Sequence, residues 1–208
     1  IENHENLYWL SQSSANWDKY YKQTTNIDAS LFSFSPIGNT DTLFTGSYNG
    51  DGYFINGINM NLPESNNIGL FGYIGGEDDS YTGSTTIQNL GLTNVSITGK
   101  HQVGAMVGYK RYGTLTVSNC YSTGSVTGAS DVGGLVGYLR TNSIVSNSFY
   151  NSTTSGQSDT GKGTPKTTAE MKVASPFTAT GWDFEIETVN GSNNYWDMDN
   201  VNGAYNSG

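Results

Sequence analysis

Short apolar segments recur along the middle of the chain at a nearly constant spacing. The segment Val103–Tyr109 returns as Val132–Tyr138 after 132 − 103 = 29 residues, and a weaker copy, Asn67–Tyr73, precedes it by 103 − 67 = 36 residues. Each copy is short and is bounded by Gly, Asn or Ser, a pattern typical of strands separated by turns. A fixed period in the range of about 20–50 residues predicts an architecture of stacked repeats.

Two further elements keep the same period. The triplet Ile87–Asn89 returns as Val117–Asn119 and Val145–Asn147, and a glycine follows each asparagine after nine or ten residues. Each repeat therefore offers three strand candidates of about four to eight residues, a normal strand length. In the middle repeat the predicted strands are Val103–Tyr109, Thr114–Tyr121 and Gly124–Gly128.

Such a repeat cannot bury an apolar face alone, and stacking solves this because equivalent strands then pair in parallel. Like residues come to lie over each other in columns. We expect Val107 to lie between Phe71 and Val136, and Val117 to lie between Ile87 and Val145. The sequence thus predicts an all-β fold, a right-handed parallel β-solenoid (β-helix) with very little helix, the hand following the rule for parallel crossovers.

The regions before the repeats are predicted to form a cap and irregular first coils. Residues 1–20 carry a short helical pattern with Leu7 and Leu10 on its apolar side, and Ser11–Ser14 should end it. Solenoids need caps because an end repeat exposes apolar surface. Residues 21–67 form strand-like first coils, in which Asn49–Gly52 is the strongest turn pattern of the chain.

The repeats occupy residues 68–156, and the period is lost in residues 157–208. Thr167–Glu170 has the spacing of a capping box, so a short helix is expected there, ended by Pro176. Aromatic residues follow, including Trp182, Tyr195 and Trp196. This region either covers the last repeat, closes an irregular side cluster, or links to a further domain.

Composition agrees with strands and tight turns. Only 13% of the residues are charged, while the chain contains 27 Gly and 14 Tyr. Amphipathic helices usually need a charged outer face. The net charge of −9 makes nucleic acid an unsuitable partner, because phosphates would be repelled. No apolar run reaches the ~20 residues of a membrane span, so membrane insertion is not expected.

The ends and the single cysteine add two expectations. The chain starts at Ile1 without an initiating Met, and we expect it to be a processed or excised part of a longer protein. Cys120 stands in a strand-like run and has no partner for an internal disulfide. It is interpreted as a small core residue.

Two columns of equivalent residues have alternative interpretations. Tyr73, Tyr109 and Tyr138 either pack inward, as strand alternation indicates, or form an exposed row of rings that binds a ligand such as a sugar. The asparagines at 89, 119 and 147 either form a side-chain ladder or supply left-handed turn residues, and the two roles are compatible.

The candidate metal ligands are few. Glu77, Asp78 and Asp79 form the densest acidic run and lie in the insertion that lengthens one repeat. They are candidate ligands for calcium, a cation that takes several oxygen ligands, or they form a solvated loop tip. Asp197–Gly203 matches the start of a calcium-binding loop, but Val201 interrupts the pattern and no closing Glu follows. No other cofactor is expected.

No catalytic motif is found, and no catalytic residue is predicted. The two histidines are His4 and His101, and His4-Glu5 does not continue into the zinc-protease pattern. The chain also lacks the Gly-x-Ser-x-Gly nucleophile motif and a P-loop. The expectation is that the protein is not an enzyme.

The repeats also carry a family resemblance. Val132–Gly137 resembles the core of the GLUG-motif repeat, and Val103–Gly108 is a looser copy with Ala and Met in place of Gly and Leu. Surrounding segments such as Tyr121–Val126 and Thr168–Met171 resemble the same proteins, so the likeness covers roughly Tyr21–Phe184. It implies an exported bacterial β-solenoid, often part of an adhesin, and the same right-handed fold.

Some relatives in that family flank the peptidase domain of immunoglobulin A proteases, but the metal-binding motif of that peptidase is missing here. The resemblance therefore implies a secreted or cell-surface, non-catalytic structural or adhesive module. Its expected partners are an extracellular glycan, a protein surface or further copies of itself in filaments.

The alternative is a carbohydrate-active β-helix enzyme, a polysaccharide lyase or hydrolase. Such an enzyme needs charged residues gathered on one lateral face. The repeat strands carry few of them, mostly near turns, namely Lys100, Lys110, Arg111, Asp131 and Arg140.

Overall fold

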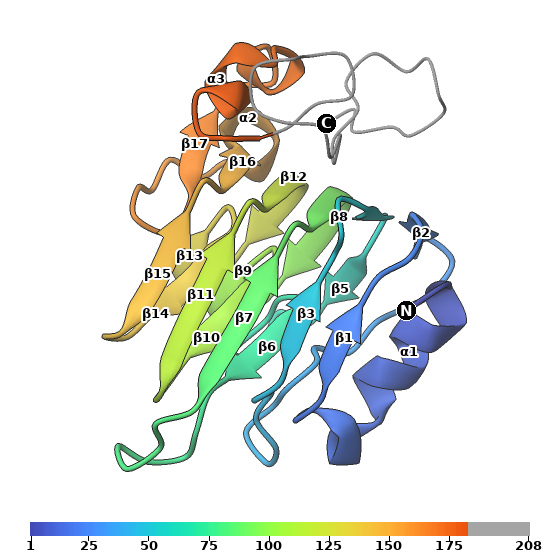
Figure 1. Ribbon diagram of the computed structural model, residues 1–208, viewed down its shortest axis with the longest axis vertical. Helices are drawn as coiled ribbons and strands as arrows, with labels where there is room; N and C mark the ends of the chain where they lie inside the picture. The colour runs from blue at the N-terminus through green and yellow to red at the C-terminus, as the bar shows by residue number, and fades with distance from the viewer. Residues whose placement is uncertain (183–208) are drawn as a thin grey trace.

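The computed structural model describes residues 1–182 and shows a solenoid of parallel strands (Figure 1). Two sheets lie on successive faces of each coil. The first has the order β1 (Tyr20–Lys22), β3 (Ser47–Asn49), β7 (Ser84–Gln88), β11 (Thr114–Ser118) and β15 (Ser143–Ser146). The second has the order β14 (Val136–Leu139), β10 (Val107–Lys110) and β6 (Phe71–Ile74).

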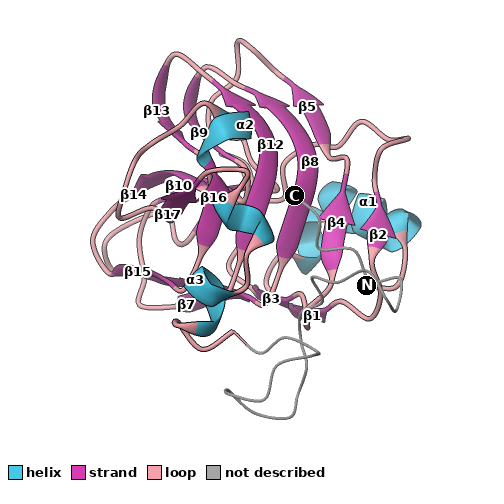
Figure 2. Cartoon of the chain, turned by 90° about the horizontal axis from the view of Figure 1, so that it is seen from above, coloured by secondary structure: helices cyan, strands magenta, loops and turns pink. Residues whose placement is uncertain are grey.

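Two more sheets complete the coils. The longer has the order β17 (Thr164–Lys166), β16 (Phe149–Asn151), β12 (Tyr121–Thr127), β8 (Gly91–Thr98), β4 (Phe54–Asn56) and β2 (Ile27–Asp28), with β5 (Asn59–Asn61) also paired to β8. The shorter pairs β13 (Ser130–Gly133) with β9 (His101–Gly104). Figure 2 shows β4, β8 and β12 side by side, with β9 and β13 to one side and the N-terminal helix to the other. The predicted parallel β-solenoid is confirmed.

The predicted register is also confirmed. Val107 pairs with Phe71 on one side and with Val136 on the other, and all three side chains are fully buried. Val117 lies between Ile87 and Val145 in the same manner. One hydrophobic cluster runs through the stacked coils, so the columns read from the sequence are the core of the protein.

The predicted strand Val103–Tyr109 is wrong in one respect, because a corner at Ala105 and Met106 divides it into β9 and β10. Glycine makes the corner possible. A Cβ on Gly104 would lie 2.4 Å from the carbonyl oxygen of Val107, and one on Gly108 would lie 2.5 Å from the backbone carbon of Asn67. The repeated glycines therefore serve a close approach of backbones, and not only turns.

Both interpretations of the asparagine column hold for Asn89 and Asn119, and Asn147 shares their left-handed backbone. Asn89, Asn119 and Asn147 have φ values of 52°, 51° and 47°, in the left-handed region. The side-chain amide of Asn89 also donates to the side-chain oxygen of Asn49 at 3.1 Å. This column turns the chain between β11 and β12, so the predicted strand Thr114–Tyr121 ends at Ser118. Cys120 is buried at this corner, as a small core residue.

The predicted N-terminal helix is α1 (His4–Gln12), which begins at Asn3, whose side chain accepts from the amide of Asn6. Its Leu7 and Leu10 are fully buried in the main hydrophobic cluster. A 3-10 turn, η1 (Ser14–Asn16), follows. The helix lies beside β1 and covers the first coil (Figure 1). Within residues 1–182, no helix has the length and apolar character needed to cross a membrane.

The helix α2 (Ser152–Ser155) lies at the end of the repeat region, and the region after it contains the 3-10 turn η2 (Glu170–Lys172) and the helix α3 (Ser175–Thr178). The capping box forms: the Thr167 amide donates to the Glu170 carboxylate at 2.7 Å, and the Glu170 amide donates to the Thr167 hydroxyl oxygen at 3.2 Å. The prediction that Pro176 ends this helix is wrong. Pro176 lies in the first turn of α3, where a missing N–H costs nothing.

Aromatic residues of this region form a side cluster. Phe177 and Trp182 pack with Met171 against Tyr121 and Phe149. The indole N–H of Trp182 donates to the backbone oxygen of Asn147 at 2.9 Å. The predicted aromatics Tyr195 and Trp196, like the weak calcium pattern Asp197–Gly203, lie outside the described residues.

Candidate functional site

The three tyrosines stack as a continuous column along the second sheet. Tyr109 pairs in register with Tyr73 and Tyr138, and its ring centroid lies 5.0 Å and 5.4 Å from theirs. Their exposure increases along the column: Tyr73 is 8% exposed, Tyr109 is half-buried and Tyr138 is 40% exposed. Tyr73 at one end of the column is therefore packed in the protein, whereas the ring of Tyr138 at the other end is accessible to solvent.

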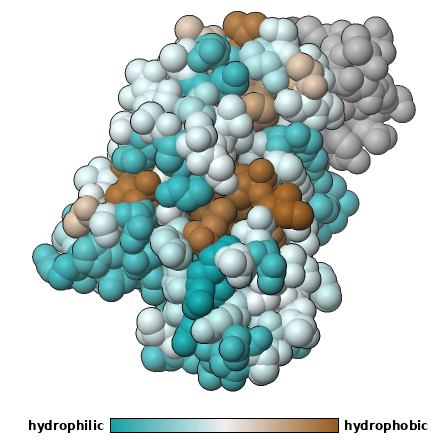
Figure 3. Space-filling view, turned by 90° about the vertical axis from the view of Figure 1, so that its left-hand side faces the viewer, coloured by the Kyte–Doolittle hydropathy of each residue, from teal (hydrophilic) through white to brown (hydrophobic). Residues whose placement is uncertain are grey.

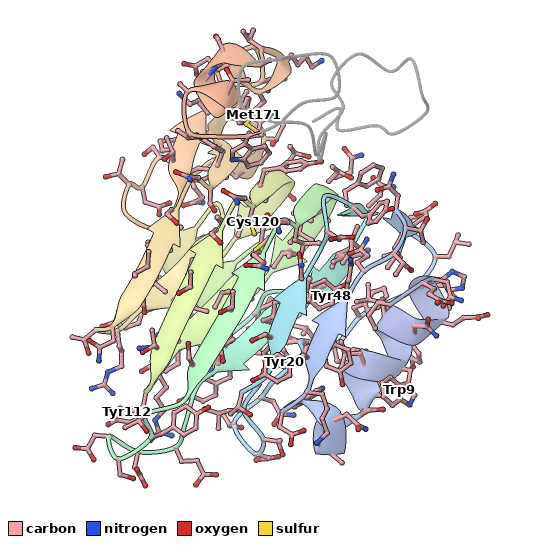
Figure 4. The ribbon with its side chains drawn as sticks, viewed as in Figure 1. Trp9, Tyr20, Tyr48, Tyr112, Cys120 and Met171 are labelled. Atoms are coloured by element: carbon pink, nitrogen blue, oxygen red, sulfur yellow. The ribbon has the colours of Figure 1, made fainter. Side chains whose placement is uncertain are left out.

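Cationic side chains lie where this sheet ends. Lys110 pairs with Leu139 in register, so Arg111 and Arg140 occupy equivalent positions in adjacent coils. The guanidinium carbons of Arg111 and Arg140 lie 5.4 Å and 4.5 Å from the ring centroid of Tyr112. We call Lys110, Arg111, Tyr112 and Arg140 the basic corner. Figure 4 places Tyr112 at the end of the molecule away from the C-terminal helices.

The basic corner is held by specific contacts. The buried Lys110 ammonium donates to the backbone oxygen of Thr141, in the loop after β14. Burial, followed by the charge of Arg140, lowers the pKa of Lys110. Hydrogen bonding to Tyr112, with a further contribution from Tyr109, raises the pKa of Arg140. Arg140 thus connects the corner to the tyrosine column.

A cavity of about 470 Å³ opens at the basic corner. Its remaining lining is mostly polar and comes from two neighbouring loops and the start of β11: Asp79, Tyr81, Thr82, Gly113, Thr114, Thr141 and Asn142. An isolated antiparallel bridge between Gly76 and Tyr112 joins the loop of the first repeat to the corner. The hydroxyl, amide and cationic groups can together bind a polar, anionic ligand.

The sequence pattern predicts Lys110, Arg111 and Arg140 near turns, as a few scattered charges, and does not predict that they lie together. The signal was present in the period, since Arg111 and Arg140 are 140 − 111 = 29 residues apart, the same distance as Val103 and Val132. Tyr112 and the loop before β7 fall outside the repeated pattern.

The candidate calcium ligands Glu77, Asp78 and Asp79 lie in an exposed loop. The Asp78 carboxylate accepts from the amide of Ser80 at 3.0 Å and from its hydroxyl, and these bonds lower the pKa of Asp78. Within residues 1–182, no three His, Cys, Asp or Glu side chains gather in a way that could hold a metal ion. The structure thus gives Asp78 the role of a turn cap and does not bring the three carboxylates together.

Groups with catalytic chemistry lie apart from the basic corner. His4 stacks on Phe32 with ring centroids 4.6 Å apart. The ring nitrogen Nδ1 of His101 lies 2.8 Å from the hydroxyl oxygen of Ser130, across the β9–β13 pair. Burial raises the pKa of the Cys120 thiol to about 12, which keeps it protonated and unreactive near neutral pH.

The last coil presents apolar surface, which Figure 3 shows gathered on that end of the molecule. Ile144 is 56% exposed, and Val132, Leu139 and Val145 are only half-buried. Among the described residues, β13, β14 and β15 each stand at the edge of their sheet. Such an edge offers unpaired backbone groups to another strand.

Comparisons with known proteins give partial matches. No family model matches the chain. Halomucin of Haloquadratum walsbyi is 35% identical over 118 residues, which cover 52% of this chain and 1% of halomucin. A provisionally assigned Gly-rich membrane protein of Evansella cellulosilytica is 63% identical over 41 residues, covering 20% of this chain and 5% of that protein. The chain thus spans a small fraction of the length of these relatives.

One solved structure is also similar. It is a provisionally assigned immunoglobulin A1 protease from Bacteroides ovatus, with a TM-score of 0.38 and 16% sequence identity. The match covers 73% of this chain and 66% of that chain.

Proposed function

We propose that the chain is a non-catalytic structural and adhesive module of an exported surface protein, similar to the GLUG-repeat solenoids that its repeats resemble. The tyrosine column carries the proposal. A parallel solenoid fixes three rings at regular spacing, and the column opens to solvent at Tyr138. Rigid aromatic rows of this kind offer flat apolar faces to sugar rings or protein surfaces.

The relatives support the location. One is named halomucin and another a Gly-rich membrane protein, and both are far longer than the matched segment. A repeat segment within a long surface protein fits a chain that is polar, acidic and low in charge density. We therefore propose that this chain lies outside the cell.

Surface labelling of intact cells of the source organism tests the location. An antibody raised against the purified chain should stain intact cells, and brief protease treatment of those cells should remove the signal. A cytoplasmic protein serves as the control for membrane integrity. Staining that appears only after permeabilisation would overturn the proposed location.

A glycan array tests the binding role, with Tyr138→Ala and Tyr20→Ala as matched variants. Tyr20 is 86% exposed and stands in β1, away from the column. Tyr138→Ala should weaken binding to a glycan hit, whereas Tyr20→Ala should not. Equal binding by both variants would remove the column from the proposed site.

Self-association is a second candidate, favoured by the exposed apolar last coil. Neighbouring copies would then pair through the edges of β13, β14 and β15, where the Gly137 carbonyl of β14 already accepts from the Lys162 ammonium at 2.6 Å. Sedimentation of the wild-type chain and of Ile144→Lys tests this. Concentration-dependent assembly that Ile144→Lys abolishes would support pairing at this end, whereas a monomer at all concentrations would exclude it.

A further inference from the structure

The basic corner concentrates positive charge in a strongly acidic chain. The chain has 9 Lys and Arg against 18 Asp and Glu, yet three of the nine cations meet at this corner. The ion pairs found within residues 1–182 involve His4, Lys19, Lys22, Lys100 and Lys162, and none involves the corner. A local positive field on an acidic surface selects for compact anionic groups at that place.

The three cations are close neighbours, and none of them forms an ion pair within residues 1–182. Arg111 and Arg140 extend from equivalent positions of adjacent coils, which are about 4.8 Å apart in a parallel sheet. Like charges at such spacing repel each other, and an anion placed between them would relieve the repulsion. Asp79 also lines the cavity, and Asp78 of the same loop interacts electrostatically with Arg111, so the three cations of the basic corner face two carboxylates.

The form of these cations determines which anion fits. A guanidinium presents a planar set of donors that matches a carboxylate or sulfate group with two hydrogen bonds. Tyr112 lies against both guanidinium groups and restricts their orientation. The buried Lys110 binds the loop that carries Arg140, so the corner is organised before a ligand arrives.

The neighbouring tyrosine column indicates a saccharide. Tyr138 is the most exposed ring of the column and precedes Arg140 by two residues. Arg140 directly follows β14, the strand that carries Tyr138, and its guanidinium lies over the Tyr112 ring, so the cations adjoin the tyrosine column. Sugar rings can stack on the tyrosines while their acidic substituents reach the arginines, and sugar hydroxyls find partners in Thr82, Thr114 and Thr141.

We propose that the basic corner binds acidic saccharides, with carboxylate or sulfate groups paired to Arg111 and Arg140 and a sugar ring on Tyr138. The inference deepens the proposed function, on which it rests, by naming the class of ligand. A cavity of about 470 Å³ is within the range of about 300–1,000 Å³ that is usual for small-ligand sites.

The experiment is a calorimetric titration of the full chain with four defined probes. They are a hyaluronan hexasaccharide, which carries carboxylates, a heparin hexasaccharide, which also carries sulfates, neutral maltohexaose, and a short poly-glutamate peptide. The double variant Arg111→Gln/Arg140→Gln tests the corner. The control, Lys19→Gln/Lys172→Gln, removes the same charge from exposed sites elsewhere. Thermal melts establish that both variants are folded.

The proposal expects one or both acidic hexasaccharides to bind wild type, more weakly as salt rises, while maltohexaose does not bind. Comparison of the hyaluronan and heparin affinities tells whether carboxylate groups alone are sufficient for binding. The corner variant should bind at least tenfold more weakly, and the control within twofold of wild type. Equal losses in the two variants, tighter binding of poly-glutamate, or no binding of either acidic probe would overturn the proposal. Surface labelling reports separately on the proposed function, so either can fail alone.

Discussion

The side-chain amide of Asn119 donates a hydrogen bond of 3.2 Å to the side-chain oxygen of Asn89, its equivalent one coil earlier. Asn89 donates in turn to Asn49, so three coils are joined by a side-chain ladder. Each rung lies at a corner where the backbone must change direction. Asn89 and Asn119 therefore each supply a positive φ and a bond to the preceding coil.

Substitutions at Asn119 separate these two contributions. Asn119→Gly retains the left-handed backbone but removes the ladder bond, and should lower the free energy of unfolding by about 1 kcal/mol. Asn119→Ala loses the bond and also adopts an unfavourable φ, which adds about 1–2 kcal/mol. Urea denaturation measures both. If the Gly variant is as stable as wild type, the ladder contributes nothing; if Gly and Ala are equal, the backbone conformation does not matter.

Gly108 tests the explanation of the repeated glycines. A Cβ at this position would lie 2.5 Å, 2.6 Å and 2.7 Å from backbone atoms of Asn67, Ile68 and Gly72. Because backbone cannot move aside like a flexible side chain, Gly108→Ala should destabilise by about 3 kcal/mol.

The matched control for Gly108 is Gly161→Ala. Gly161 has a φ of +84° and nothing within 4 Å of its Cβ position, so only backbone strain of about 1 kcal/mol is expected. Denaturant melts of the two variants give the comparison. If Gly108→Ala lowers the free energy of unfolding less than Gly161→Ala does, the backbone around Gly108 can move apart to admit a methyl group.

The stacked columns could be predicted because they depend on period alone. Val107, Val117 and their equivalents repeat at fixed distances, and parallel stacking converts that repetition directly into contacts. The corner at Ala105 and Met106 could not be predicted, because the apolar run Ala105–Val107 between two glycines resembles the middle of a strand. No Asn, Asp, Ser or Pro marks a turn there, and the close approach of backbone segments at the glycines is visible only in the structure.

The candidate site was predicted in part for the same reason. The tyrosine column follows the sequence period and could be predicted. The exposure of each ring depends on the residues that cover it, and the period gives no information on these. The basic corner also needs Tyr112 and the insertion before β7, whose bridge between Gly76 and Tyr112 has no counterpart in the repeated pattern. A non-repeating loop must be placed by its own contacts.

Val136 tests the inward face of the last repeats. Its side chain is fully buried beside Val107, so Val136→Asp places a carboxylate without a partner in the core and should cost about 4 kcal/mol. Val136→Ala, which only removes volume, should cost about half as much.

Ser130→Asp is the exposed control for Val136. Ser130 begins β13, where it is exposed and pairs in register with His101. A carboxylate there remains in water, and the change should stay within about 0.5 kcal/mol. Thermal melts decide the matter, and equal melting temperatures for Val136→Asp and Ser130→Asp would mean that the inward face is misassigned.

The buried thiol of Cys120 predicts how stability depends on alkaline pH. Burial raises its pKa to about 12, whereas an unfolded chain has a cysteine pKa of about 8.5. Between these values the unfolded state binds fewer protons than the folded state, so stability falls as pH rises from about 9 toward 12. Burial raises the pKa of Tyr48 and Tyr121 as well, which adds a loss of the same sign above about pH 10.

Cys120→Ala isolates the thiol from the tyrosines. The free energy of unfolding of wild type should fall by about 1–2 kcal/mol more between pH 8 and pH 10 than that of the variant, whatever the difference between them at pH 7. Urea melts at the two pH values measure this slope. A thiol reagent at pH 8 should also label wild type only after denaturant is added. Rapid labelling of the native protein, or equal slopes for the two proteins, would show that the corner between β11 and β12 admits water and that the thiol ionises in the folded state.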